Sequence, residues 1–164
     1  MKKLRLILFE ECNRKCEGCC NKDWDLKSLP IIHDYKQFDM ILLTGGEPLL
    51  CPTIVRTTIE NIRRESKATI IIYTALVDSP LIFYALLELV DGITLTIHEQ
   101  NDVPDFYVLC AILANSNITG KTMRLNVFEG ITIQNIPSYW IVKKDMKWIK
   151  NCPLPEGEIL GRLQ

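Results

Sequence analysis

The sequence predicts an α/β fold: an open, partial (β/α) barrel of about six mostly parallel strands. Short apolar stretches alternate along the chain with longer segments of helical periodicity, which is typical of repeated βα units. Several of the apolar stretches are continuous runs of Ile, Leu and Val, as expected for parallel strands covered on both faces. The chain has 164 residues, too few for a closed eight-stranded barrel of roughly 200 residues or more, so the sheet should remain open.

Each strand candidate has about the usual length of a strand and is rich in Ile, Leu and Val. The candidates are residues 4–9, 39–44, 68–74, 92–98, 123–128 and 138–143. The helical patterns between them are residues 30–37, 52–66, 79–90 and 104–116. The pattern at 52–66 is the strongest, because Pro52 stands where helices begin and the apolar residues after it recur on one helical face.

Repeated βα units form a parallel sheet with right-handed crossovers, and ligands bind at the carboxyl ends of its strands. The residues at these ends are therefore the candidates for chemistry. A cysteine-rich loop follows the first strand, TGGEPLL from Thr44 follows the second, and Thr74 ends the third. His98 ends the fourth, and Arg124 and Asn126 lie within the fifth. These residues are expected to share one rim of the sheet.

Composition and charge are those of an ordinary globular protein with one core. The chain is 48% hydrophobic and 24% charged, with a formal net charge of -1, so we expect one domain at 1–150 and a loosely structured C-terminal tail at 151–164. No apolar run approaches the roughly 18 residues that span a bilayer, and the N-terminal apolar stretch is too short for a signal peptide. A cytoplasmic protein without membrane contact is expected. The near-neutral charge argues against binding to nucleic acid.

The seven cysteines are the strongest chemical signal in the chain. Without an export signal, such a number favours metal binding or catalysis over disulfides. Cys51, Cys110 and Cys152 stand alone and are interpreted as small buried hydrophobic residues. The other four crowd into nine positions: Cys12, Cys16, Cys19 and Cys20.

Two kinds of metal site compete for this cluster. A structural zinc site needs four ligands, usually in two separated pairs, but only Cys16 and Cys19 form such a pair, and His33 is the nearest candidate for a fourth ligand. Three thiolates within eight residues, 12 to 19, suit an iron–sulfur cube held by one loop, which leaves its fourth iron open to another ligand. The spacing therefore favours an iron–sulfur site.

Two motifs together resemble the radical S-adenosylmethionine (SAM) superfamily. The spacing C-x3-C-x2-C follows the first strand, and Gly-Gly-Glu-Pro follows the second; the resemblance extends to the Arg-x-Asn-Val of the fifth strand. It implies an oxidoreductase in which a reduced 4Fe–4S cluster cleaves SAM to a 5'-deoxyadenosyl radical that abstracts a hydrogen atom. An electron donor such as flavodoxin or ferredoxin is implied as well.

The resemblance also implies a role for each matching residue. Cys12, Cys16 and Cys19 would each bind one iron, SAM would bind the fourth, and Cys20 would be a neighbour packed under the loop. Glu47 would accept a hydrogen bond from the ammonium group of SAM, and a bulky side chain at Gly46 would enter the space of its methionine part. The residues implied for SAM binding are Thr44, Gly45, Gly46, Glu47, Thr74, Thr96, His98 and Asn126.

One departure from the superfamily pattern points to a partner. The residue before the third cysteine is usually aromatic in the superfamily, but here it is Gly18. Together with Cys19, Asn21 and Trp24, it resembles the small activating enzymes of anaerobic ribonucleotide reductase, which implies a glycyl-radical enzyme as partner. Two alternatives stay open: a radical SAM enzyme acting on a small molecule, nucleoside or peptide, and a non-enzymatic cysteine-rich metal-binding interaction module.

Overall fold

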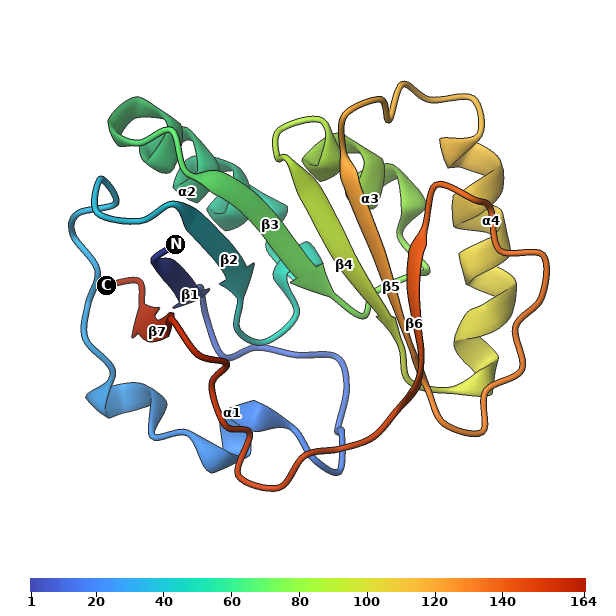
Figure 1. The fold of residues 1–164 in the computed structure, drawn as a ribbon, viewed down its shortest axis with the longest axis horizontal. Coiled ribbons are helices and arrows are strands. Elements are labelled where there is room, and N and C mark those ends of the chain that lie inside the picture. The colour runs from blue at the N-terminus through green and yellow to red at the C-terminus, as the bar shows by residue number, and fades with distance from the viewer.

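Seven parallel strands form one open sheet in the computed structural model, which describes residues 1–164 (Figure 1). Their order across the sheet is β6-β5-β4-β3-β2-β1-β7. The open α/β architecture is therefore confirmed, with one strand more than expected. The strands are β1 (Lys3–Ile7), β2 (Met40–Thr44), β3 (Thr69–Thr74), β4 (Gly92–Ile97), β5 (Thr122–Phe128), β6 (Ile141–Met146) and β7 (Glu158–Arg162).

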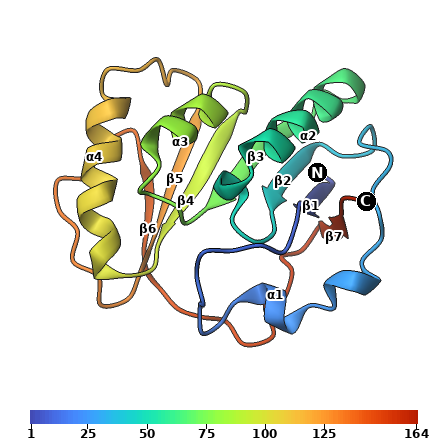
Figure 2. The same cartoon turned by 180° about the vertical axis from the view of Figure 1, so that it is seen from behind.

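Three helices lie on one face of the sheet (Figure 2), namely α2 (Pro52–Glu65), α3 (Pro80–Leu87) and α4 (Val103–Leu113). Each has a proline in its first turn, where the missing N–H costs no hydrogen bond. A one-turn helix, α1 (Cys20–Asp23), lies beyond the carboxyl ends of the strands (Figure 1). None of the helices has the length and apolar character required to cross a bilayer.

The hydrophobic core lies between the sheet and these three helices. Side chains of a strand alternate between its two faces, and in β1 the core receives Leu4 and Leu6, while Arg5 between them points to the other face. Strand β5 alternates in the same way around Arg124. The face without helices, called here the inner face, therefore carries polar side chains in these two strands, whereas the continuous apolar runs of β2, β3 and β4 are buried at consecutive residues, as expected for coverage on both faces.

The last third of the chain differs most from the sequence prediction. The strand expected at 138–143 lies at Ile141–Met146, and the segment 151–164, expected to be a loose tail, contains β7, which pairs with β1. The helix expected at 30–37 is absent. This segment instead runs along the outer edge of β7, where the Ile32 N–H donates to the carbonyl of Arg162 at 3.0 Å. Hydrogen bonds between distant segments thus replace the local helical pattern.

Candidate cofactor site at the carboxyl ends of the strands

The cysteine loop, residues 8–19, connects β1 to α1 and brings three free thiols to the rim of the sheet. Cys12 is exposed, and Cys16 and Cys19 are half-buried. They line a cavity of about 140 Å³, called here the thiol cavity, which also receives residues from the ends of β2, β3 and β4. The residues that line it are Cys12, Arg14, Cys16, Cys19, Gly46, Glu47, Tyr73, Thr74, Ala75 and Thr96. The predicted convergence at one rim is therefore present for these residues.

The turn after β2 is bonded directly to the backbone of the cysteine loop. The N–H of Gly46 donates to the carbonyl of Phe9 at 2.7 Å, and the N–H of Glu47 donates to the carbonyl of Glu11 at 2.8 Å. The side-chain amide of Asn21 donates to the carbonyl of Gly45 at 2.8 Å. A β-carbon at residue 46 would lie 1.7 Å from the carbonyl oxygen of Glu11. Gly46 thus allows the close approach of two backbones, and a side chain there would point at the loop rather than into a ligand.

Replacing Gly46 by Ala is therefore expected to displace the cysteine loop and to lower the free energy of unfolding by about 3 kcal/mol, because backbone atoms cannot yield as a flexible side chain can. Gly130→Ala is the comparison, since Gly130 has a positive φ of 80° but no atom within 4 Å of its β-carbon position. It should cost only about 1 kcal/mol, for its backbone conformation alone. Urea unfolding of both variants tests this, and equal losses would contradict the role of the close approach.

Glu47 fastens β2 to β3 through a buried carboxylate. Its Oε1 accepts hydrogen bonds from the Leu49 N–H at 3.1 Å and the Thr74 hydroxyl at 2.6 Å, and its Oε2 accepts one from the Ala75 N–H at 2.9 Å. Burial raises the pKa of this carboxyl, although these donors oppose the shift. Since each carboxylate oxygen can accept about two hydrogen bonds, one acceptor position on Oε2 remains for a ligand in the thiol cavity.

Arg14 fastens the cysteine loop to the ends of β3 and β4. Its guanidinium donates to Asp102 Oδ1 at 2.5 Å and to the carbonyl of Ala75 at 3.1 Å. The other oxygen of Asp102 accepts the N–H groups of His98 and Glu99, both at 3.1 Å. Neither residue could be recognised from the sequence, because a charged pair 88 positions apart leaves no local pattern. The pair fixes the loop across the rim.

Arg14→Met is expected to lower the free energy of unfolding by about 3 kcal/mol, because Asp102 would lose its cationic partner in a nearly buried position. Lys147→Met removes a cation from an exposed pair, in which Lys147 lies 3.0 Å from Glu129. That change should cost less than about 1 kcal/mol. Thermal or urea unfolding of the two variants is the measurement, and an Arg14 variant as stable as the Lys147 variant would contradict this role.

His98 lies against the cysteine loop. Its Nδ1 is 3.6 Å from Cys16 Sγ, and its ring contacts Phe128 and Trp148 at centroid distances of 4.8 and 5.1 Å. Burial, aided by the charge of Arg14, lowers the pKa of His98 to about 4. The imidazole is therefore neutral at pH 7 and can hydrogen bond to a thiol or thiolate.

A second and larger cavity of about 440 Å³, called here the inner cavity, lies against the inner face of the sheet and shares Tyr73 and Thr96 with the thiol cavity. The predicted ligand residues His98 and Asn126 line it; Thr44 and Gly45 line neither cavity. No acidic residue lines the inner cavity, whereas four cationic side chains do. These are Arg5, Arg124, Lys143 and Lys147.

Cys20 and Cys152 form a disulfide, with their Cα atoms 5.3 Å apart. The expectation that the thiols serve metal binding or catalysis rather than disulfides is therefore wrong for this pair, and Cys152 is not an isolated buried residue. Spacing could not reveal the pair, since 132 positions separate its members. Cys110, by contrast, is buried as predicted.

The donor set of the thiol cavity fits an iron–sulfur cluster. Burial raises the pKa of the Cys16 thiol, and the neighbouring thiolates of Cys19 and Cys12 raise it further. Cationic irons would offset this repulsion. No group of three or more His, Cys, Asp or Glu side chains is placed to hold one metal ion, but the thiolates of an iron–sulfur cube bind separate irons and need not converge on one point.

No family model, curated protein or solved structure matches the chain. A function has to be inferred from the residues of the two cavities and from their arrangement.

Proposed function

We propose that the protein is a radical SAM enzyme. The observation that carries the proposal is the thiol cavity, in which the three free thiols of a C-x3-C-x2-C loop face Glu47 of the Gly-Gly-Glu-Pro turn. A single-ion zinc module would explain the thiols but not a buried carboxylate with an acceptor position left over, nor a second cavity that shares two lining residues with the first.

In this proposal Cys12, Cys16 and Cys19 hold a 4Fe–4S cluster through their thiolates. When bound and reduced, the cluster supplies the electron that cleaves SAM to methionine and a 5'-deoxyadenosyl radical. The open parallel sheet is compatible with the partial barrel of this superfamily. Flavodoxin or ferredoxin would be suitable electron donors.

The side chains of the chain itself bind and shield the reactants. Glu47 accepts from the ammonium group of SAM at its remaining acceptor position, and Thr96, which lines both cavities, lies where the ligand passes from one to the other. The thiol cavity is too small for the whole cofactor, so its adenosine part would extend into the inner cavity beside Asn126 and His98. Phe128 and Trp148, whose rings are 4.4 Å apart, exclude water on that side.

Reductive cleavage of SAM tests the proposal. The chain, reconstituted with iron and sulfide under anaerobic conditions and reduced with dithionite, is expected to form 5'-deoxyadenosine and methionine in equal amounts, slowly, even without a substrate. Product analysis by chromatography is the measurement. A protein that takes up zinc but no sulfide, or that carries the cluster but leaves SAM intact, would contradict the proposal.

A further inference from the structure

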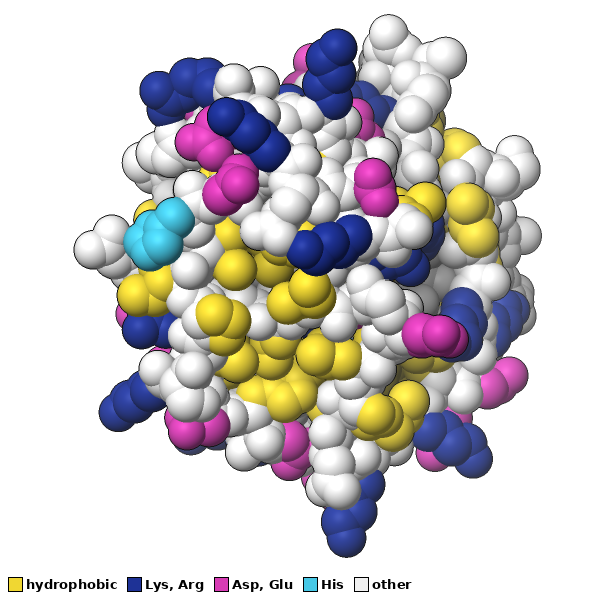
Figure 3. Space-filling view, turned by 60° about the vertical axis from the view of Figure 1, so that its left-hand side comes forward, with side chains coloured by type: hydrophobic (Ala, Val, Ile, Leu, Met, Phe, Trp, Pro, Cys, Tyr) yellow, Lys and Arg dark blue, Asp and Glu magenta, His cyan; other side chains and the backbone are white.

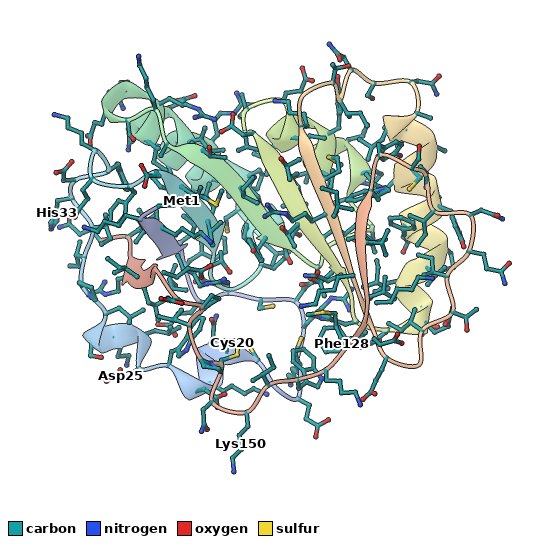
Figure 4. The ribbon with its side chains drawn as sticks, in the orientation of Figure 1. Met1, Cys20, Asp25, His33, Phe128 and Lys150 are labelled. Carbon is teal, nitrogen blue, oxygen red and sulfur yellow. A yellow bond between two sulfur atoms is a disulfide. The ribbon has the colours of Figure 1, made fainter.

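The connection from β6 to β7, residues 147–157 and called here the strap, crosses the molecule. Strands β6 and β7 are at opposite edges of the sheet, so the strap has to pass from one edge to the other. It does so beyond the carboxyl ends of the strands, beside α1 (Figure 1, Figure 4). It therefore runs along the same rim as the cysteine loop.

The strap closes one side of the inner cavity. Trp148, Ile149, Cys152 and Pro153 line this cavity from the strap, opposite residues of the inner face such as Thr94. The Thr94 hydroxyl is buried without a hydrogen-bond partner. A cavity with a mixed apolar and cationic lining therefore lies beneath a segment that has no regular secondary structure of its own.

The strap is fastened mainly to the segment of Gly18 to Trp24. Cys152 forms its disulfide with Cys20, and the indole N–H of Trp24 donates to the carbonyl of Cys152 at 3.2 Å. A β-carbon at Gly18 would lie 2.7 Å from Cβ of Trp148, which shows how closely the strap and the loop approach. Between Trp148 and Cys152 the strap is loosely packed, since Ile149 is 60% exposed.

The strap backbone is strained where the disulfide holds it. Asn151 and Cys152 both have positive φ, 63° and 36°. Asparagine tolerates this left-handed region, but for cysteine it is costly and persists only where surrounding contacts enforce it, so the strain lies at Cys152. Without the disulfide, Cys152 would keep only one hydrogen bond to a residue outside the strap, that to Trp24, against this strain. The strap would then be held near its middle by this bond and by the packing of Trp148 on Phe128 and His98, so it could open much more often.

We propose that Cys20 and Cys152 form a redox-active disulfide that fastens the strap over the inner cavity and releases it on reduction by a dithiol. A thiolate of the dithiol attacks one sulfur of the pair, and the mixed disulfide that results is resolved by the second thiol of the donor. The S–S bond breaks, Cys20 and Cys152 each gain a proton and together two electrons, and the dithiol becomes a disulfide. Both cysteines are half-buried and line the inner cavity, so a reductant can reach them.

The consequence for ligands rests on the proposed function. If the adenosine part of SAM enters the inner cavity, the oxidised strap hinders its entry and the reduced strap permits it. The disulfide adjoins the cysteine loop, because Cys20 directly follows the candidate ligand Cys19. A protein that needs a reduced cluster would then admit its cofactor only under reducing conditions.

The state of the disulfide and the motion of the strap can be measured on the full chain without iron or SAM. Iodoacetamide labelling, mapped by mass spectrometry, should leave Cys20 and Cys152 unmodified before treatment with dithiothreitol and modify both afterwards. Trypsin should cleave after Lys147 and Lys150 about tenfold faster in the reduced protein, because cleavage follows the population of the open strap. Labelling of both cysteines without reductant, or equal cleavage rates in the two states, would overturn the proposal.

Two variants separate the disulfide from general effects of the reductant. Cys152→Ser should be cleaved at the fast rate without dithiothreitol, whereas Cys51→Ser, which removes a free thiol outside both cavities, should keep the slow rate of the oxidised protein. Slow tryptic cleavage of Cys152→Ser without dithiothreitol would overturn the proposal.

The link to SAM needs a separate measurement. SAM should bind the reconstituted wild type about tenfold more weakly before dithiothreitol than after, since only the open fraction is competent to bind. Cys152→Ser should show no such dependence. If labelling and cleavage behave as expected but no SAM is bound or cleaved in either state, the proposed function fails and the redox-active strap stands. Equal binding of SAM in both redox states would overturn the proposal that the strap controls access of SAM to the inner cavity.

Discussion

Alanine in place of Cys12, Cys16 or Cys19 is expected to abolish assembly of the iron–sulfur cluster and, with it, all cleavage of SAM. Each thiolate would bind a different iron, so removing one leaves an iron without a protein ligand. The effect should be all-or-none rather than graded. Wild-type protein reconstituted under anaerobic conditions should contain about four iron and four sulfide per chain, and each variant close to none. Iron and sulfide analysis, together with the visible absorption spectrum, is the measurement.

Cys20→Ala and Cys51→Ala are the matched controls, because each removes one sulfur without touching the thiol cavity. Both should keep the full iron and sulfide content, although Cys20→Ala also breaks the disulfide to Cys152. Loss of the cluster in Cys20→Ala with retention in Cys19→Ala would show that Cys20, and not Cys19, is the third ligand of the cluster. Stoichiometric zinc without sulfide in the wild type would instead support the metal-binding module.

The thiol cavity could be predicted from sequence because the order of strands in space follows their order in the chain over this region. Strands β4, β3, β2 and β1 are successive neighbours in the sheet. The loop or residue that follows each of them is therefore next to the loop after its neighbour. Local motifs at strand ends, such as Cys19, Gly46 and Thr74, are thus brought together by a topology that hydrophobic patterns reveal.

The part of the fold that the sequence did not reveal depends on contacts between distant residues. Strand β7 has only five residues and pairs with β1, which is more than 150 positions away. At Gly161 an added β-carbon would lie 2.6 Å from the side chain of Ile32. This glycine, unfavourable in a strand by propensity, is needed for the close packing of the segment at 30–32, the same segment whose pattern predicts a helix.

The directions in which side chains point could not be predicted from the sequence either. Gly46 was expected to make room for a ligand, whereas the atoms that its β-carbon would meet belong to the backbone of Glu10 and Glu11. A sequence motif shows that a glycine is present but not which neighbour approaches it. In the same way, no motif in the sequence predicts that Trp148 lies over Gly18 and His98 beside the inner cavity.

Of the substrates that the sequence leaves open, we propose another protein, because the exposed surface favours it. Strand β6 is an edge strand with a row of exposed residues, and Ile141 and Val142 are 64% and 37% exposed. Figure 3 shows that apolar side chains also gather in the middle of one face of the molecule, surrounded by charged ones. Exposed apolar surface of this kind is typical of contacts with other proteins, and an open strand edge can pair with an extended segment of a partner.

A glycine-centred radical on a larger partner enzyme is therefore the expected product of the proposed reaction. The chain, reduced and supplied with SAM and with a candidate glycyl-radical enzyme, should produce a doublet in electron paramagnetic resonance, with 5'-deoxyadenosine formed in proportion. The signal should be absent when Cys16→Ala replaces the wild type, because no adenosyl radical can form without the cluster. Val142→Lys should reduce the signal, because it places a charge on the exposed edge. The same variant should cleave SAM at the wild-type rate without partner, since Val142 lines neither cavity. Rapid turnover of SAM with a free nucleotide or short peptide, in the absence of any partner protein, would show that the substrate is a small molecule instead.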